Sequence, residues 1–322
     1  MPSLKEIKNR ITSVQSTRKI TSAMKMVASS KLHHAQVAIE NMLPYESTLE
    51  HILKTFLASE ADARTVFSQK REVKRVALVV YSSNSSLCGG FNANAIKLMQ
   101  QVVEEYSHIG RENITIYPIG RKVAEKVNKL GLRSAGNFQA LADKPNIADC
   151  ITIARELGEK FINGELDRVE LIYYHFKSAG SQTLTRKTFL PIDVEEQLAE
   201  DKERDLKSNV STREAQEYLR RRDRQQVQRQ QKEAKPLNDN FIVEPSMEVV
   251  LRKLIPKLAH LVLYPALLDN VASEHAARMV AMQTATDNAD ELLRQLRLQY
   301  NKSRQQAITN ELLDIVGGSV NR

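Results

Sequence analysis

The feature that most constrains this chain is the scarcity of helix breakers at its two ends. No glycine precedes Gly89, and only Pro44 interrupts the first sixty residues. Near the other end, residues 271–316 contain neither proline nor glycine. A helix of about fifty residues is about 75 Å long, which is longer than a compact domain is wide. The sequence therefore predicts two terminal helices that extend beyond any globular part.

The first helix carries a start signal and a narrow apolar stripe. Ser3 with Glu6 three residues later forms a capping box. The apolar positions that follow recur at steps of three, four and six, and they are Ile7, Ile11, Val14, Ile20, Met24 and Val27. A stripe this narrow is typical of a coiled-coil seam. We expect it to pack against the second long helix, antiparallel to it.

Residues 71–193 have a different pattern. Apolar strand-like runs start near residues 76, 114 and 168, and amphipathic helices ended by Gly131 and Gly164 lie between them. The run from residue 168 and a fourth strand-like run flank Ala179–Ser181 and predict a hairpin. Alternating strands and helices indicate a parallel sheet, here with an antiparallel pair at one edge.

The rest of the chain completes the domain organisation. Residues 194–238 are rich in Glu, Arg and Gln and predict a charged helical insert, in which Ser211 and Glu214 form a second capping box. Helical patterning returns near Glu244, with kinks or breaks expected at Pro256 and Pro265 and an end at Gly317–Gly318. The predicted fold is a Rossmann-like α/β domain (71–193) inserted between an N-terminal (1–60) and a C-terminal (241–322) coiled-coil helix.

Charge favours an acidic partner. The net charge is +8, and basic residues crowd the first helix. Nucleic-acid binding is disfavoured because the cations lie around the helix and no aromatic side chains alternate with them. The N-terminus predicts no signal peptide, and no stretch reaches the length of a membrane span.

The segment 76–96 resembles the start of a nucleotide-binding fold. A β-branched run is followed by Gly89–Gly90, and Asn92 or Asn94 is placed to cap the next helix. However, neither GxGxxG nor GxxxxGK[ST] is present. We interpret the glycines as turn residues and expect no bound cofactor.

No catalytic or metal-binding constellation emerges from the remaining residue types. His33 and His34 point about 100° apart on a helix, and strand alternation accounts for His175. Asp287 and Asp290 read as surface carboxylates, and Cys88 as a small buried turn residue. The two cysteines, Cys88 and Cys150, form no CxxC pair, and a disulfide would need the fold to bring them together.

The two ends of the chain carry a family resemblance. Residues 7–36, IKNRITSVQSTRKITSAMKMVASSKLHHAQ, and the run that starts ASEHAARMVAMQTATDNADELL resemble the terminal helices of gamma subunits of F-type ATP synthases. SLCGGFNAN and NFIVEPS resemble two further segments of that family. The resemblance spans most of the chain, apart from residues 194 to about 238.

The resemblance implies a non-catalytic rotor. The coiled coil would turn inside a hexamer of alpha and beta subunits, and the α/β domain would rest on the membrane c-ring beside epsilon. Proton or sodium flow would drive rotation, and membrane association would arise only through the complex. The implied location is the cytoplasmic face of a bacterial inner membrane, or the equivalent face of an organelle.

The resemblance also carries site residues over to this sequence. Positions implicated in torque coupling to beta fall on Met24, Lys25, Arg278, Gln305, Thr309 and Glu311. Positions facing the c-ring and epsilon fall on Phe241 and Ile242. An antiparallel pairing would put Met24 opposite the C-terminal group. The tip suits a shaft that turns without sticking, because it consists of apolar residues and two glycines: Leu312, Leu313, Ile315, Val316 and Gly317–Gly318.

Two departures and two alternatives accompany this prediction. SSNSSLCGG stands where the family commonly has SDRGLCGG, and the insert contains no cysteine, which excludes thiol regulation through it. We hypothesise that the insert lies along the α/β domain or brakes rotation by touching the stator. The alternatives are an α/β nucleotide-binding domain with a coiled-coil oligomerisation arm, and a basic coiled-coil nucleic-acid binder.

Overall fold

A computed structural model describes residues 3–59, 71–192, 244 and 247–320. The chain divides into two compact units, which we describe separately. The coil unit comprises residues 1–28 and 278–322, and the domain unit comprises residues 29–277. Two long helices, α1 (Leu4–Ser59) and α8 (Met247–Val320), contribute to both. Phe241, Ile242 and the predicted insert lie outside the described residues.

The domain unit is built on a five-stranded sheet with the order β3-β2-β1-β4-β5. The strands are β1 (Val76–Tyr81), β2 (Ile114–Ile119), β3 (Arg133–Ser134), β4 (Arg168–Ser178) and β5 (Ser181–Leu190). The first four are parallel, and β5 pairs antiparallel with β4 at the edge. The predicted α/β sheet with an antiparallel hairpin is confirmed.

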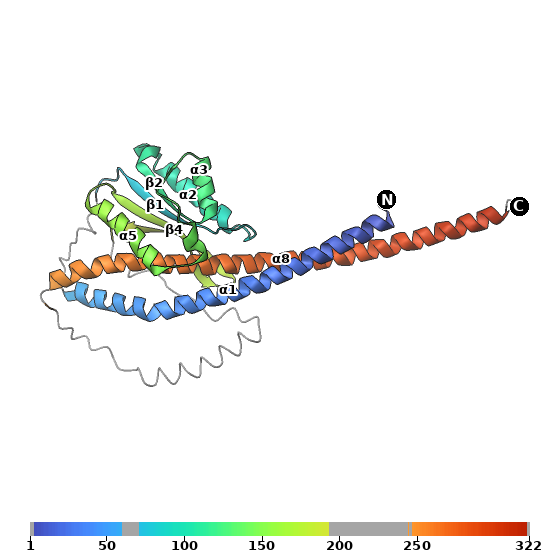
Figure 1. Cartoon of the computed structure of the whole chain (residues 1–322), viewed down its shortest axis with the longest axis horizontal. Coiled ribbons are helices and arrows are strands. Elements are labelled where there is room, and N and C mark those ends of the chain that lie inside the picture. Colours follow the sequence, from blue (N-terminus) through green and yellow to red (C-terminus); the bar gives the residue numbers. More distant parts are fainter. Residues whose placement is uncertain (1–2, 60–70, 193–243, 245–246, 321–322) are drawn as a thin grey trace, which may run out of the picture. The chain divides into compact units, whose positions relative to one another are not determined.

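Alternating side chains of the buried strands build two cores, one on each face of the sheet. Leu78, Val80 and Ile116 pack with α2 (Phe91–Glu105) and α3 (Arg121–Lys129) on one face. On the other, Tyr117 donates to Glu156 of α5 (Ile147–Ile162), and Tyr81 to a carbonyl of α8. Short pieces complete the domain: 3-10 turns at Ser107–Ile109 and Arg111–Asn113, and α4 (Gln139–Asp143). Figure 1 shows the sheet between these helices.

Local sequence signals account for most helix boundaries in the domain unit. Asn146 caps α5 by accepting a hydrogen bond from the Ala148 amide, and Gly131 and Gly164 follow α3 and α5 with positive φ. The prediction that Asn92 or Asn94 caps α2 is wrong. The N-cap is Gly90, and Asn92 instead binds the preceding loop.

The coil unit is an antiparallel helix pair with heptad spacing. On α1 the seam positions recur at steps of three and four, and they are Leu4, Ile7, Ile11, Val14, Arg18, Thr21, Lys25 and Ala28. The Thr21 and Thr286 hydroxyls lie 2.8 Å apart, and Arg18 Nε lies 2.6 Å from Asp290 Oδ1. Because the partner number rises as the α1 number falls, the two helices run in opposite directions. This confirms the predicted antiparallel coiled coil.

The α8 side of the seam follows the same rule. Its positions are Met282, Thr286, Ala289, Leu293, Leu296, Tyr300, Ser303 and Ala307, and four of them, Met282, Ala289, Leu293 and Leu296, are buried. The Thr21–Thr286 contact sets the register, which places Ile7 opposite Tyr300 and Lys25 opposite Met282.

Three expectations about the long helices need correction. Ile20 and Val27 are exposed, at 60% and 57%, because the seam passes through Thr21 and Ala28 instead. The helix α8 runs without a break through Pro256 and Pro265, so the expected interruption is wrong while the expected kink stays a prediction, and the helix continues through Gly317–Gly318 to Val320. A helix can continue through a proline when neighbouring elements support it, so the prolines alone do not determine where α8 begins or ends.

The start of α1 is as predicted. The Ser3 amide donates to Glu6 Oε2 at 2.8 Å, and the Glu6 amide donates to Ser3 Oγ at 3.2 Å. This reciprocal pair is the capping box, which satisfies two amides that the first helical turn leaves unpaired.

Candidate partner-binding surface

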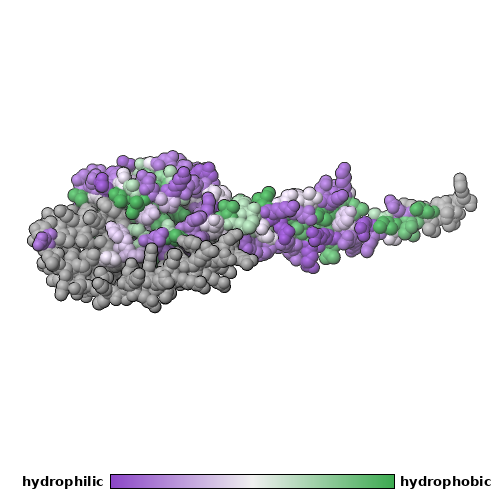
Figure 2. All heavy atoms as spheres, turned by 60° about the horizontal axis from the view of Figure 1, so that its bottom comes forward, coloured by the Kyte–Doolittle hydropathy of each residue, from purple (hydrophilic) through white to green (hydrophobic). Residues whose placement is uncertain are grey.

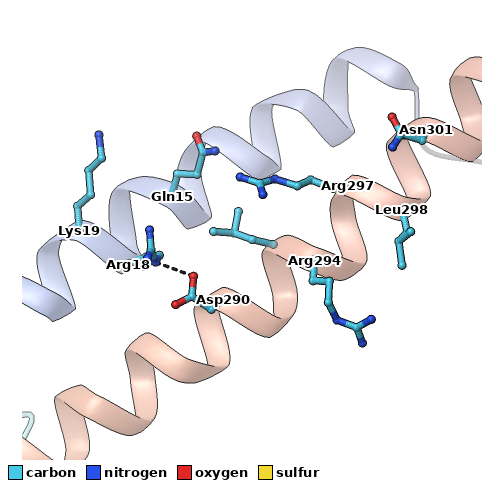
Figure 3. A pocket seen from close by; sticks show the side chains of 9 residues that line it. Gln15, Arg18, Lys19, Asp290, Arg294, Arg297, Leu298 and Asn301 are labelled. Atoms are coloured by element: carbon cyan, nitrogen blue, oxygen red, sulfur yellow. Dashed lines mark ion pairs between the residues drawn. The ribbon is translucent and has the colours of Figure 1, made fainter.

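A basic groove runs along the coil unit between α1 and α8. It has a volume of about 540 Å³ and is lined by Gln15, Arg18, Lys19, Asp290, Leu293, Arg294, Arg297, Leu298 and Asn301. Figure 3 shows these side chains arising from both helices. Four lining residues are cationic and one is acidic, so the groove presents net positive charge.

Two of the four cations are already paired within the coil unit. Arg18 binds Asp290, and Arg294 forms two hydrogen bonds with Glu291, which hold the pKa of that carboxyl down to about 2. Lys19 and Arg297 have no carboxylate within 4.0 Å among the described residues. These two cations are the ones that a bound acidic group would meet without displacing an existing partner.

The groove follows from the heptad seam. Arg18 occupies a seam position on α1 opposite Ala289, whose small side chain leaves room beside the contact. The Arg18 guanidinium cannot be buried there, so it turns outward to Asp290, and both side chains stay about half exposed. A polar residue at a seam position thus opens the coil surface locally. Counting the three-four spacing from Leu4 would have revealed Arg18 and Lys25 as seam residues.

The predicted coupling residues fall into two zones of the coil unit. Met24 and Lys25 are half-buried, and so is Arg278, which lies about one and a half turns from the level of Met24 on α8. Gln305, Thr309 and Glu311 are exposed. The register puts Met24 near Gln283, so Gln305 lies about 33 Å further along the axis. The expectation that Met24 faces the whole C-terminal group is therefore wrong.

The C-terminal zone belongs to a single helix. The register brings Ser3 level with Arg304, so α8 beyond this point has no α1 residue beside it among those described (Figure 1). Leu312, Leu313 and Ile315 are 57%, 63% and 69% exposed. Figure 2 shows hydrophobic surface toward the narrow end of the coil unit.

A second exposed apolar surface lies on α1. Ile20, Met26 and Val27 are each more than half exposed, and Val280 on α8 is 48% exposed at the level of Val27. Monomeric proteins seldom leave such side chains grouped in water, so grouped exposure indicates a contact surface. The recurrence of apolar residues along the sequence predicts Ile20 and Val27 in the seam, whereas in the structure they belong to this surface.

The loop after β1 is filled by its own side chains. Asn92 Oδ1 accepts from the Ser83 amide at 3.0 Å, and its Nδ2 donates to the Ser85 carbonyl at 3.2 Å. Asn84 Oδ1 accepts from the Arg121 amide. Gly89 has φ of +60°, which confirms its interpretation as a turn residue.

Open α/β sheets bind ligands in the crevice at the carboxyl ends of the strands, at the point where the strand order reverses. In this protein the helix α8 lies in that crevice. In this sheet the reversal lies between β1 and β4. Tyr81, the last residue of β1, donates to the Leu263 carbonyl of α8, and α8 side chains contact β4 just beyond β1. A helix of the chain itself therefore stands where a nucleotide would be expected.

Metal binding and disulfide bonding are the other chemistries that the described residues could support. No group of three or more His, Cys, Asp or Glu side chains there has metal-site geometry. Cys88 and Cys150 are buried free thiols, not a disulfide. His175 binds Asp269 of α8 at 2.7 Å, a contact that strand alternation had not suggested. No helix among the described residues is long and apolar enough to cross a membrane.

Comparisons with known proteins match the whole chain to one family. A family model described as ATP synthase matches residues 3–320. The ATP synthase gamma chains of Phocaeicola vulgatus and Bacteroides thetaiotaomicron are 51% and 50% identical over 320 residues, which cover 99% of this chain and all of each relative.

Solved structures share the fold at lower identity. A chain of the Euglena gracilis mitochondrial ATP synthase is 18% identical with a TM-score of 0.59, over 99% of this chain and 94% of that one. A chain from the central stalk and c-ring of the Tetrahymena thermophila enzyme is 24% identical with a TM-score of 0.54, over 83% of this chain and 99% of that one. The protein belongs to the ATP synthase gamma-chain family.

Proposed function

We propose that this gamma chain is the rotor that transmits torque between a membrane c-ring and the catalytic alpha/beta hexamer, driven by protons or sodium ions. The observation that carries the proposal is the antiparallel coil, whose heptad seam is fixed in register by Thr21 and Thr286. Two helices locked in this way resist bending and twisting better than one, as a shaft requires. The chain itself performs no bond chemistry in this proposal.

The coil surface is suited to binding two kinds of partner segment, acidic and apolar. The basic groove with Lys19 and Arg297 suits acidic segments of beta subunits, and the exposed side chains of Ile20, Met26 and Val27 suit apolar ones. We propose that Met24, Lys25 and Arg278 form one coupling zone, and that Gln305, Thr309 and Glu311 form another. The separation of about 33 Å implies that the two zones meet different parts of the hexamer.

The foot of the rotor is the domain unit. We propose that it rests on the c-ring beside epsilon, with Phe241 and Ile242 on that side, and that the chain reaches the membrane only through the complex. The location that follows is the cytoplasmic face of a bacterial inner membrane.

Reconstitution tests this function. The chain is combined with alpha, beta, epsilon and the membrane sector in vesicles, and ATP-driven ion uptake is measured with and without it. We expect coupled uptake only when the chain is present. A complex that assembles and pumps equally well without the chain would exclude a rotor role.

A charge reversal tests the coupling zone on α1. Lys25→Glu should lower the ratio of ions pumped to ATP hydrolysed, whereas Lys97→Glu, an exposed change on α2 that belongs to neither zone, should leave it unchanged. Equal ratios for the two variants would remove Lys25 from the coupling zone.

A further inference from the structure

A short stretch of α8 in the domain unit is buried on every side although much of it is polar. All eleven residues from Ala266 to Ala276 are buried, and five of them are polar: Asp269, Asn270, Ser273, Glu274 and His275. A helix surrounded by protein is normally apolar, because each buried polar group must recover the hydrogen bonds that it loses to water. This composition therefore needs a reason other than hydrophobic burial.

The first contact between α8 and β4 takes the place of strand pairing beyond the end of β1. β1 pairs with β4 only as far as Ile172, whereas β4 continues to Ser178. At the next exposed backbone position, the Tyr174 amide donates to Asn270 Oδ1 at 3.3 Å and the Tyr174 carbonyl accepts from Ser273 Oγ at 3.4 Å. Two side chains of α8 thus satisfy both backbone groups of Tyr174, which β1 leaves unpaired.

The second contact lies on the following residue of β4. His175 Nδ1 donates to Asp269 Oδ2 at 2.7 Å, and the two side chains are 10% and 1% exposed. Successive strand residues point to opposite faces, so α8 holds the end of β4 both along its edge and on one face. The Phe91–Tyr174 ring stack, with centroids 4.5 Å apart, and Ala277 beside it close the other face.

Directional contacts of this kind specify position more than they add stability. A buried polar pair is often no more stabilising than apolar residues of the same volume. However, a shift of α8 by one turn, about 5.4 Å, would break all three hydrogen bonds together and leave their groups buried and unpaired. An apolar interface would permit such sliding or rotation at lower cost.

We propose that Asp269, Asn270 and Ser273 form a register joint that fixes α8 axially and rotationally on the α/β domain and transmits torque between them. The proposal rests on the rotor function. In that function the domain is driven from the membrane side while α8 continues into the coil, so any slip at this joint would waste rotation. The three residues are positioning residues, since they contact neither substrate nor partner in this assignment.

Near-isosteric apolar substitutions test the joint. Asn270→Leu and Ser273→Ala remove the contacts to Tyr174 with little change in shape, and the matched control Leu267→Met alters the same buried segment without touching a polar group. Each variant is assembled into the full complex in vesicles, where ATP hydrolysis and ATP-driven ion uptake are measured together. We expect hydrolysis within about twofold of the unsubstituted complex in every case, but a several-fold lower ratio of uptake to hydrolysis for Asn270→Leu and Ser273→Ala.

Exchanging the two partners His175 and Asp269 distinguishes a positioning role from a purely structural one. Asp269→Leu should lower the uptake ratio, Asp269→Asn should retain most of it because an amide oxygen still accepts from His175, and His175→Asp with Asp269→His should restore it. A purely structural role would instead lower assembly without changing the ratio in the complexes that form.

Three results would overturn the joint. One is an uptake ratio equal to that of the unsubstituted complex in Asn270→Leu and Ser273→Ala. Another is failure of the swapped pair to rescue Asp269→Leu, and the third is loss of the folded domain, by circular dichroism, in both apolar variants. If the unsubstituted chain fails to support coupled uptake, the rotor function itself is wrong, and the two failures remain distinguishable.

Discussion

At the scale of single residues, the domain unit shows side chains used to close backbone gaps. Asn92 was expected to cap α2, but its amide group holds the loop between β1 and α2. Asn270 and Ser273 do the same for the open end of β4. Amide and hydroxyl side chains are suited to this because each can imitate the backbone groups of a missing strand or turn.

Gly120 is predicted to be irreplaceable at the end of β2. Its φ is +109°, and an added Cβ would collide with the Ser82 carbonyl oxygen. Gly120→Ala should lower the free energy of unfolding by about 2 kcal/mol, measured by urea denaturation. Gly180→Ala is the matched control, since nothing lies within 4 Å of its added Cβ. Equal stability of the two variants would contradict the close approach.

Cys150 is predicted to resist alkylation in the folded protein. Burial, with a smaller contribution from the Asp149 charge, raises the pKa of its thiol to about 12. The raised pKa keeps the thiol neutral, so at pH 8 only about one in ten thousand molecules carries the reactive thiolate. Mass spectrometry after iodoacetamide treatment should find Cys150 labelled about a thousandfold more slowly than in urea. Labelling at the urea rate in buffer would refute its burial.

At the scale of elements, the coil includes charged seam residues that weaken the pairing of its two helices. Two of the eight seam positions on α1 described above are cationic, Arg18 and Lys25. A seam made only of apolar residues would pair the helices more tightly, so these cations indicate selection for something other than stability.

Lys25→Leu should therefore stabilise the isolated chain. Leucine opposite Met282 would bury apolar surface that lysine leaves partly hydrated, and the free energy of unfolding should rise by about 1 kcal/mol. The control Lys19→Leu changes an exposed position off the seam and should have little effect. Thermal unfolding compares the two, and a lower Tm for Lys25→Leu would exclude Lys25 from the seam.

The register of the coil can be fixed by cross-linking. Thr21→Cys with Thr286→Cys should oxidise to a disulfide, because the native hydroxyls lie 2.8 Å apart. Thr21→Cys with Leu293→Cys is displaced by one heptad, about 10 Å, and should stay reduced. Gel mobility with and without reductant distinguishes them, and oxidation of the second pair alone would require a different register.

At the scale of the whole molecule, the proposed function has the chain meet its partners through separate surfaces, and the predicted insert would be a further one. Deleting residues 198–234 tests the hypothesis that the insert brakes rotation. If it does, the variant complex should hydrolyse ATP faster, by about twofold or more, while ATP synthesis changes less. Unchanged rates in both directions would remove the brake hypothesis but leave the rotor function intact.

The sequence by itself determined the periodic parts of this protein. Strand runs, turn glycines and the capping box at Ser3 and Glu6 are local, and the heptad spacing is written in the order of residues, so these features follow from short-range physics. The family could be read from the ends of the chain because long helices leave uninterrupted, distinctive runs. Ile20 and Val27 are hydrophobic but lie off the three-four spacing, so hydrophobicity alone predicts their place in the seam wrongly.

Only the tertiary structure decided which distant residues meet. The Thr21–Thr286 register, the Arg18–Asp290 contact and the joint between Asn270 and Tyr174 join residues that lie far apart in the chain. No local preference encodes such pairs, since they depend on how two long helices and a sheet edge align. The buried polar stretch of α8 is likewise explained only by β4, whose end lies against it.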